Sequence, residues 1–284
     1  METFLDALLD ALVDTAKLAP FLFVTYLVME LVEHRAGDRS RRVMERAGAF
    51  GPAVGALLGA VPQCGFSASA AGLYSGGVVT AGTLVAVFVS TSDEMIPLML
   101  SSDRPGAILK VVGIKILIAL ILGFALDLAL RLMKKQPRKH VEELCAHDHC
   151  HCERGVVRSA LIHTLEIVAF IFAINLALNI VVETVGESAV EAFLSSSPVL
   201  APVAAALVGL IPNCAASVLL TRLALSGILS AGAAVGGLVT GSGLGLLVLF
   251  RTNRPHRENF LFAAFLFVSG IASGLILDAL GFAL

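Results

Sequence analysis

The chain has 284 residues, of which 57% are hydrophobic and only 15% charged, and its formal net charge is −2. Soluble globular domains carry more charge and fewer apolar residues, so the composition excludes that class and indicates an integral membrane protein. No basic patch suggests a nucleic-acid partner. We therefore expect the lipid bilayer as the main partner and no nucleic acid.

The N-terminal segment, residues 1–14, is acidic and mildly apolar. It lacks the basic region and the cleavage site of a secretory signal peptide, so we expect it to remain on the mature protein. A membrane helix needs about 20 apolar residues. Four stretches meet this requirement plainly, and we predict spans at 16–32, 107–130, 161–182 and 260–281.

A run of seven residues, Val61-Pro62-Gln63-Cys64-Gly65-Phe66-Ser67, returns as Ile211-Pro212-Asn213-Cys214-Ala215-Ala216-Ser217, 150 residues further on. The same offset pairs Gly59 with Gly209 and Gly82 with Gly232. Chance does not keep one offset from Gly59 to Gly82 without a gap, so the chain is a tandem duplication.

Each copy also contains apolar segments that are interrupted or short. Segments 50–62 and 64–75, like 200–212 and 214–225, are too short for an ordinary crossing, so they are short spans or arms of re-entrant hairpins. The next segments, 78–101 and 228–250, are broken at Ser90–Glu94 and at Thr240–Gly243.

Five segments per copy give an odd number of crossings under either interpretation, so the second copy should be inverted relative to the first. The predicted fold is therefore an all-α integral membrane protein with two inverted five-segment repeats, built from proline-broken helices or re-entrant hairpins. We divide the chain into a first membrane repeat at 1–131, a Cys/His-rich linker at 132–158 and a second membrane repeat at 159–284.

Basic residues concentrate in the linker and in the loops 33–45 and 251–257. Membrane proteins keep arginine and lysine on the cytoplasmic side. We therefore predict a multi-pass protein of the plasma membrane, with the linker cytoplasmic and both termini outside.

A proline breaks a helix and frees carbonyls that protein, water or a bound ion must satisfy. An amide, a thiol and a hydroxyl accompany each proline, and inverted repeats place such breaks face to face. We expect one shared pocket. Its residues are Gln63, Cys64 and Ser67 from the first copy and Asn213, Cys214 and Ser217 from the second. The simpler alternative is that the cysteines are small buried hydrophobes and the amides cap helix ends.

Two adjacent carboxylates stand inside the apolar tract at the Ser90–Glu94 break, where each ionised group costs roughly 2.5–3.5 kcal/mol. They are suited to binding a cation or to carrying an exchanged proton. The second copy has Gly243 and Leu244 there, so the driving site is predicted to be asymmetric. The predicted substrate-binding residues at the two breaks are Ser90, Ser92, Asp93, Glu94, Thr240 and Ser242. The alternative is that Asp93 and Glu94 lie solvated at a membrane boundary.

Other intramembrane polar residues are Lys115, Asp127, Glu166, Asn175 and Asn179. We expect these to pair between helices or, near helix ends, to snorkel to the interface, and we assign them no function.

Three cysteines and three histidines crowd into eight residues of the linker. Alternating Cys and His suits Zn(II), Cu(I), Ni(II) or another thiophilic ion, although no fixed zinc-finger spacing is present. The predicted metal ligands here are Cys145, His147, His149, Cys150, His151 and Cys152.

The chain resembles the family of ten-transmembrane heavy-metal exporters, whose members are labelled manganese transporters or arsenic efflux proteins. The resemblance rests on Pro62-Gln63-Cys64, Pro212-Asn213-Cys214, the Ser92-Asp93-Glu94 break and the linker, and it extends over nearly the whole chain. It implies a metal or metalloid efflux permease with an undefined ion. No phosphate-binding loop is present, which favours a secondary transporter.

We therefore predict a transporter, not an enzyme, that exports a transition-metal or heavy-metal ion such as Mn(II) or Zn(II). The metal is the substrate, and we expect no cofactor. Cys64 and Cys214 favour soft ions, whereas Asp93 and Glu94 favour harder ones. Thiolate ligation releases protons, which offers a route to metal–proton antiport. The sequence is compatible with a homodimer and does not specify the oligomeric state.

Three alternatives remain. The first is efflux of arsenite or an organoarsenical. The second is a small-anion transporter or channel in which opposed half-helix N-termini supply positive dipoles. The third is a redox enzyme or assembly factor, against which the two break cysteines lack a Cys-x-x-Cys spacing.

Overall fold

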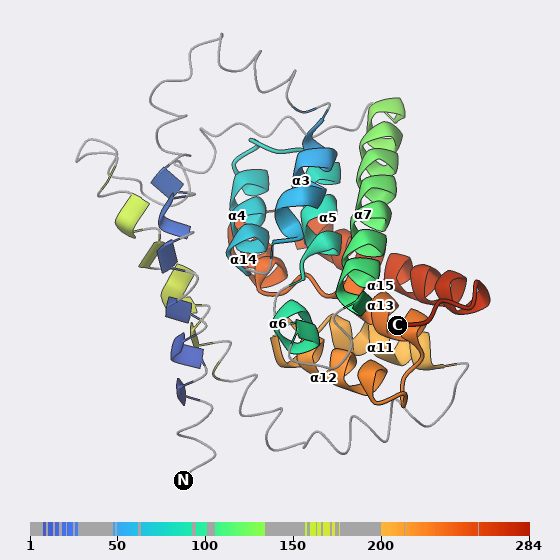
Figure 1. Ribbon diagram of the computed structural model, residues 1–284. Coiled ribbons are helices and arrows are strands. Elements are labelled where there is room, and N and C mark those ends of the chain that lie inside the picture. Colours follow the sequence, from blue (N-terminus) through green and yellow to red (C-terminus); the bar gives the residue numbers. More distant parts are fainter. Residues whose placement is uncertain are drawn as a thin grey trace.

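A computed structural model gives the fold of the chain (Figure 1). It describes residues 50–61, 64–92, 95–100, 106–133, 200–212, 214–254 and 256–284, together with residue 48 and scattered positions within 8–27 and 157–176. Every regular element in the labelled part of these ranges is a helix.

The helices of the two copies repeat in the same order. The first copy contains α3 (Gly51–Gly59), α4 (Cys64–Ser75), α5 (Ala81–Ser90), α6 (Met95–Leu100) and α7 (Gly106–Leu132). The second contains α11 (Ala201–Gly209), α12 (Cys214–Leu225), α13 (Ala231–Thr240), α14 (Gly245–Thr252) and α15 (His256–Ala279). Corresponding helices begin 150 residues apart, so the sequence duplication is also a duplication of structure.

The predicted helix interruptions are confirmed. In each copy the chain leaves the helix before the Pro-Gln-Cys or Pro-Asn-Cys motif and starts a new helix at the cysteine, Cys64 or Cys214. The turn that follows α4 and α12 contains a glycine with positive φ, 71° at Gly77 and 77° at Gly227. A residue with a side chain rarely adopts this conformation, which explains why both copies have glycine there.

Three helical stretches in the described part of the chain are long and apolar enough to cross a membrane: Gly106–Leu132, Ala231–Thr252 and His256–Ala279. The predicted spans at 107–130 and 260–281 correspond to α7 and α15, whereas those at 16–32 and 161–182 are described only at scattered positions, which are helical. Most of α13 and α14 is buried, while α7 and α15 expose apolar side chains such as Leu117 and Val268. The composition of α7 and α15 therefore fits helices at the lipid-facing periphery.

Within each copy the contacts follow one plan. Helix α5 packs against α3 and α7, and α13 packs against α11 and α15. All ten residues of α5 are buried, so this short helix forms the centre of its copy. Helix α13 holds the equivalent place and is buried from Gly232 to Thr240.

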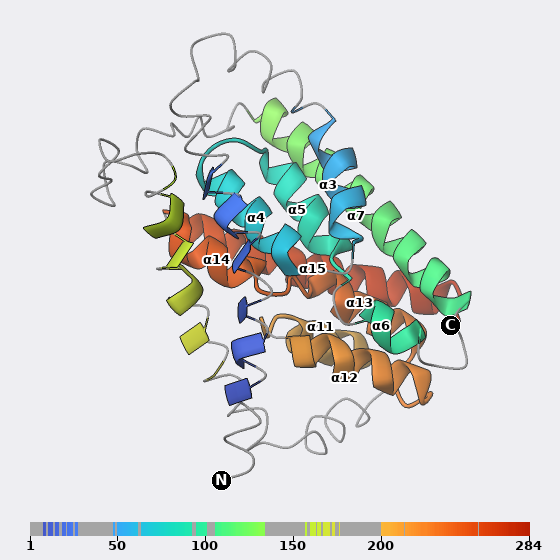
Figure 2. The ribbon, with the colours of Figure 1, turned by 60° about the vertical axis from the view of Figure 1, so that its left-hand side comes forward.

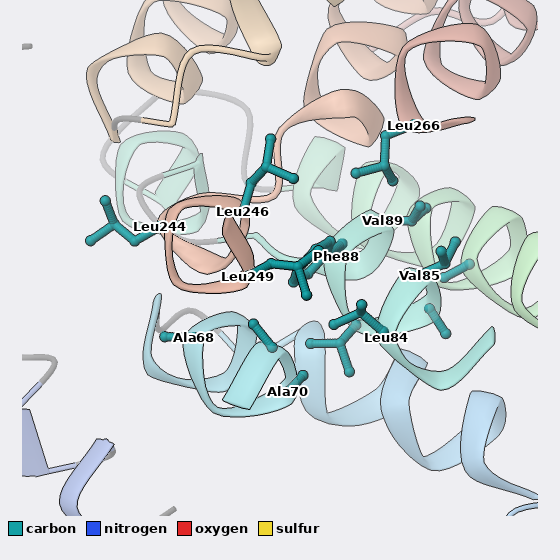
Figure 3. Close-up of a cluster of buried hydrophobic side chains, with 14 of the residues drawn as sticks. Ala68, Ala70, Leu84, Val85, Phe88, Val89, Leu244, Leu246, Leu249 and Leu266 are labelled. Carbon is teal, nitrogen blue, oxygen red and sulfur yellow. The ribbon is translucent and has the colours of Figure 1, made fainter. Parts of the chain in front are cut away.

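Short helices of each copy pack against short helices of the other copy. Helix α4 packs against α14 of the other copy, and α12 packs against α6 (Figures 1 and 2). The central helices α5 and α13 also contact each other. The Phe88 side chain of α5 lies among apolar residues of α4 and α14, including Ala68 and Leu249, and joins the two copies in one core (Figure 3).

Candidate functional site

Four helix breaks are the candidate site, and we name each one by its flanking helices. In the first copy they are the α3–α4 break (60–63) and the α5–α6 break (91–94), and in the second the α11–α12 break (210–213) and the α13–α14 break (241–244). The atoms that surround the glycines beside these breaks show which breaks are neighbours.

The two breaks of the first copy begin side by side. A Cβ atom built on Gly59, the last residue of α3, would overlap Ser90 Oγ and would lie 2.5 Å from the carbonyl oxygen of Val87. Ser90 is the last residue of α5. Helices α3 and α5 therefore end next to each other, and only glycine leaves room for this contact.

The second copy repeats the arrangement. A Cβ on Gly209, the last residue of α11, would overlap the carbonyl oxygen of Gly237 and would lie 3.3 Å from Thr240 Cβ at the end of α13. The α11–α12 and α13–α14 breaks are therefore also neighbours.

A third contact joins the copies. A Cβ on Gly245, the first residue of α14, would lie 2.8 Å from the carbonyl oxygen of Ser67 and 2.6 Å from Cε1 of Phe88. Ser67 lies in the first turn of α4 and Phe88 in the last turn of α5. The α13–α14 break thus meets the start of α4 and the end of α5, so breaks of both copies lie in one region.

The α5–α6 break offers oxygen atoms. Ser90, Thr91 and Ser92 are all buried. The hydroxyls of Ser90 and Thr91 donate to the Val87 carbonyl oxygen at 3.2 and 2.8 Å, and the Ser92 hydroxyl donates to the Ser90 carbonyl oxygen at 2.9 Å. A hydroxyl has one proton and two lone pairs, so each of these oxygens retains acceptor capacity. Such a group suits a cation better than an anion.

Lys115 is a residue of this region to which the sequence interpretation gave no function. It lies on α7, its side chain is fully buried, and its ammonium donates to the carbonyl oxygen of Thr91 in the α5–α6 break. The sequence signal that could have identified Lys115 as buried was its spacing on the helix. The buried residues of α7 recur every fourth position from Ala107 to Asp127, and Lys115 falls in this series.

Asp127 pairs with the start of a neighbouring helix, which is one of the two alternatives expected for it, and it does not snorkel to the interface. Its carboxylate is buried and accepts from the Thr80 hydroxyl at 2.7 Å and from the backbone N–H of Gly82 at 2.8 Å, at the start of α5. Asp278 does the same for α13, accepting from Ser230 at 2.8 Å and from Gly232 N–H at 3.1 Å. A carboxylate at a helix N-terminus satisfies free N–H groups and favours the helix dipole, so each aspartate anchors a half-helix.

The far ends of α4 and α14 are also joined by polar contacts. Tyr74 donates to Glu258 Oε1 at 2.6 Å, and Asn253 donates to Glu258 Oε2 at 3.1 Å. The hydroxyls of Ser75 and Thr252 are 2.7 Å apart. These bonds fasten α4 of the first copy to α14 and α15 of the second.

Several of the predicted site residues lie at the breaks. Ser67, Ser90, Ser92, Thr240 and Ser242 are buried, and Ser217 is half-buried. Thr240 donates to the Gly236 carbonyl oxygen at 3.0 Å. Cys64 and Cys214 are the first residues of α4 and α12.

The other predicted residues lie outside the described part of the chain. They are Gln63, Asp93, Glu94 and Asn213 at the breaks and Cys145, His147, His149, Cys150, His151 and Cys152 in the linker. Among the residues that are described, no three His, Cys, Asp or Glu side chains group closely enough to hold a metal ion.

Comparison with known proteins places the chain in a family. A family model described as "Putative, 10TM heavy-metal exporter" matches residues 1–183. The match covers the first copy and the linker and ends before the breaks of the second copy, so it is shorter than the resemblance seen in the sequence. No curated protein and no solved structure matches the chain.

Proposed function

Because the chain belongs to this family of heavy-metal exporters, and is therefore a multi-pass membrane protein, we propose that it is a secondary transporter that exports a transition-metal or other heavy-metal ion in exchange for protons. The observation that carries the proposal is the gathering of helix breaks from both copies around buried hydroxyl and carbonyl oxygens. Broken helices at membrane depth are tolerated where they line a binding site.

The contacts between the copies support an inverted repeat. Helix α4 meets α14, and α12 meets α6, which is the reciprocal pairing that a two-fold relation between the copies would produce. In this proposal the two-fold axis lies in the membrane plane, the substrate site lies on it, the linker is cytoplasmic and both termini are outside.

The proposed ligands come from both copies. Cys64 and Cys214 would supply sulfur at the starts of α4 and α12, and Asp93 and Glu94 would supply charge in the α5–α6 break. Ser90, Ser92, Thr240 and Ser242 would add neutral oxygens, and the amides of Gln63 and Asn213 would complete the pocket. A mixed set of this kind fits a divalent transition metal, and deprotonation of the thiols on metal binding would couple flux to proton movement.

The linker would act separately from this pocket. Its Cys/His tract at 145–152 would bind a thiophilic ion on the cytoplasmic side and deliver or sense it.

One observation favours a second candidate, a transporter of small anions. The Lys115 ammonium is buried beside the α5–α6 break, and a positive charge in that place would attract an anion such as an oxyanion of arsenic. In that case Asp93 and Glu94 would not be needed for flux.

Flux measurements in proteoliposomes distinguish the two candidates. Mn(II), Zn(II), Cd(II), Cu(I), Ni(II), arsenite and a small anion are each tested with the wild type and with the double variant Asp93→Asn, Glu94→Gln. Cation flux with opposed proton movement, lost in the variant, supports the metal–proton exporter. Anion flux that is unchanged in the variant overturns it in favour of the second candidate.

A further inference from the structure

Lys115 is placed where a transported cation would be expected to bind. It stands near the middle of the apolar helix α7, yet its side chain is fully buried and turned toward α5 instead of toward lipid or water. An ionised lysine in a membrane interior is costly, so its burial requires a compensating partner.

One partner is the end of a half-helix. The Lys115 ammonium donates to the carbonyl oxygen of Thr91, the C-cap residue that directly follows α5. The C-terminal end of a helix carries partial negative charge on its free carbonyls. The hydroxyl oxygens of Ser90 and Ser92 add acceptors beside it, since both hydroxyl protons are already donated to the backbone. The ammonium therefore binds a carbonyl oxygen of a kind that would also bind a metal ion.

The second copy shows what the same place looks like without the lysine. Asp127 and Asp278 make matching contacts with α5 and α13 but are 151 residues apart, so α7 and α15 align with a shift of one residue. This alignment pairs Lys115 with Leu266, which is fully buried beside the end of α13 and whose carbonyl oxygen lies 3.5 Å from Thr240 Oγ1. The position needs only an apolar side chain to pack, so the lysine has a separate role.

We propose that Lys115 is a tethered cation: its ammonium occupies the Thr91 carbonyl oxygen at the end of α5 when no metal ion is bound, and the transported cation binds there by displacing it. This inference rests on the proposed function, since it needs a cation as substrate. The tethered charge competes with the metal ion for the same oxygen, and this competition weakens metal binding so that the ion can be released. Lys115 is thus a positioning residue for the transport cycle.

The test is metal binding to purified full-length variants in detergent, measured by isothermal titration with Mn(II), Zn(II) and Cd(II). The cysteines and histidines of 145–152 are replaced by serine throughout, so that the linker adds no sites. Lys115→Met removes the charge and keeps the length, and Lys115→Arg keeps the charge. Lys110→Met is the matched control, because Lys110 is an exposed lysine on the same helix.

The expected result is that Lys115→Met binds metal at least about tenfold more tightly than the wild type and transports it more slowly, whereas Lys115→Arg and Lys110→Met bind like the wild type. Metal binding by Lys115→Met that is equal to or weaker than that of the wild type overturns the tethered cation and leaves the exporter intact. Failure of every protein to bind any of these cations overturns both. Monodisperse elution of each variant shows that the comparison concerns folded protein.

Discussion

The α5–α6 break and the α13–α14 break occupy equivalent places in the two copies, but their chemistry differs. The first contains two carboxylates in its sequence and is contacted by a buried lysine. The second contains Gly241 and Gly243, and Leu266 lies beside it. The supporting structure is the same in both, with an aspartate at the start of the half-helix and a glycine beside its end. The two copies thus share a symmetric scaffold, and they differ in that charged residues accompany the end of the half-helix only in the first copy.

The largest expected effect tests the shared scaffold. A Cβ on Gly82 would overlap the carbonyl oxygen of Gly123, and one on Gly232 would lie 2.6 Å from the backbone nitrogen of Asp278. Gly82→Leu and Gly232→Leu should therefore each cost about 3 kcal/mol or more and abolish folded protein. Gly113→Leu is the control, since nothing lies within 4 Å of a Cβ built there. The measurement is the yield of monodisperse protein on size exclusion chromatography. A normal yield for either Gly82→Leu or Gly232→Leu would contradict the claim that both copies need a glycine at this place.

The next effect concerns the pocket that the copies are proposed to share. Cys64→Ala and Cys214→Ala should each reduce metal flux about tenfold or more, because each removes one sulfur ligand at the start of a half-helix. Ser226→Ala, a change at the far end of α12, should leave flux unaltered. Initial rates in proteoliposomes, corrected for protein content, provide the measurement. Unaltered flux in both cysteine variants would rule out the shared pocket.

A smaller effect should separate the two anchoring aspartates. Asp127 is buried, whereas Asp278 is partly exposed near the end of α15. Asp127→Ala should lower stability by about 2–3 kcal/mol and Asp278→Ala by about 1 kcal/mol, because the unpaired N–H groups of α13 are closer to water. Thermal unfolding in detergent checks the order. Equal losses would mean that burial does not distinguish the two anchors.

The smallest effect should come from the linker. Deletion of residues 145–152 should change the metal concentration at which transport responds, without abolishing transport, because the proposed pocket lies in the membrane repeats. Flux measured over a range of metal concentrations tests this. Complete loss of transport in the deletion variant would place the essential site in the linker.

The sequence predicted the parts of the fold that depend on local chemistry. The offset of 150 residues, the helix breaks at the prolines and at Ser90 and Thr240, and the apolar helices α7 and α15 all follow from composition and spacing. An interrupted apolar tract can be recognised from the sequence alone, and the structure has helix breaks at the predicted positions.

Contacts between helices were less accessible. The pairing of α4 with α14 depends on how the two copies dock, which no periodicity records. Asp278 was missed because α15 is shifted by one residue relative to α7, so a fixed offset pairs Asp127 with Leu277 instead. Buried residues recur at every fourth position of α7, and this spacing includes Lys115. Its contact with the Thr91 carbonyl oxygen became evident only from the packing of α7 on α5.

Anomalous X-ray diffraction from crystals of the full-length protein loaded with Mn(II) or Cd(II) would test the central site most directly. We predict an anomalous peak among the four breaks, within bonding distance of oxygens at the end of α5 and of Cys64 or Cys214. A protein that transports the metal but shows its only peaks elsewhere, for example in the linker alone, would contradict the site.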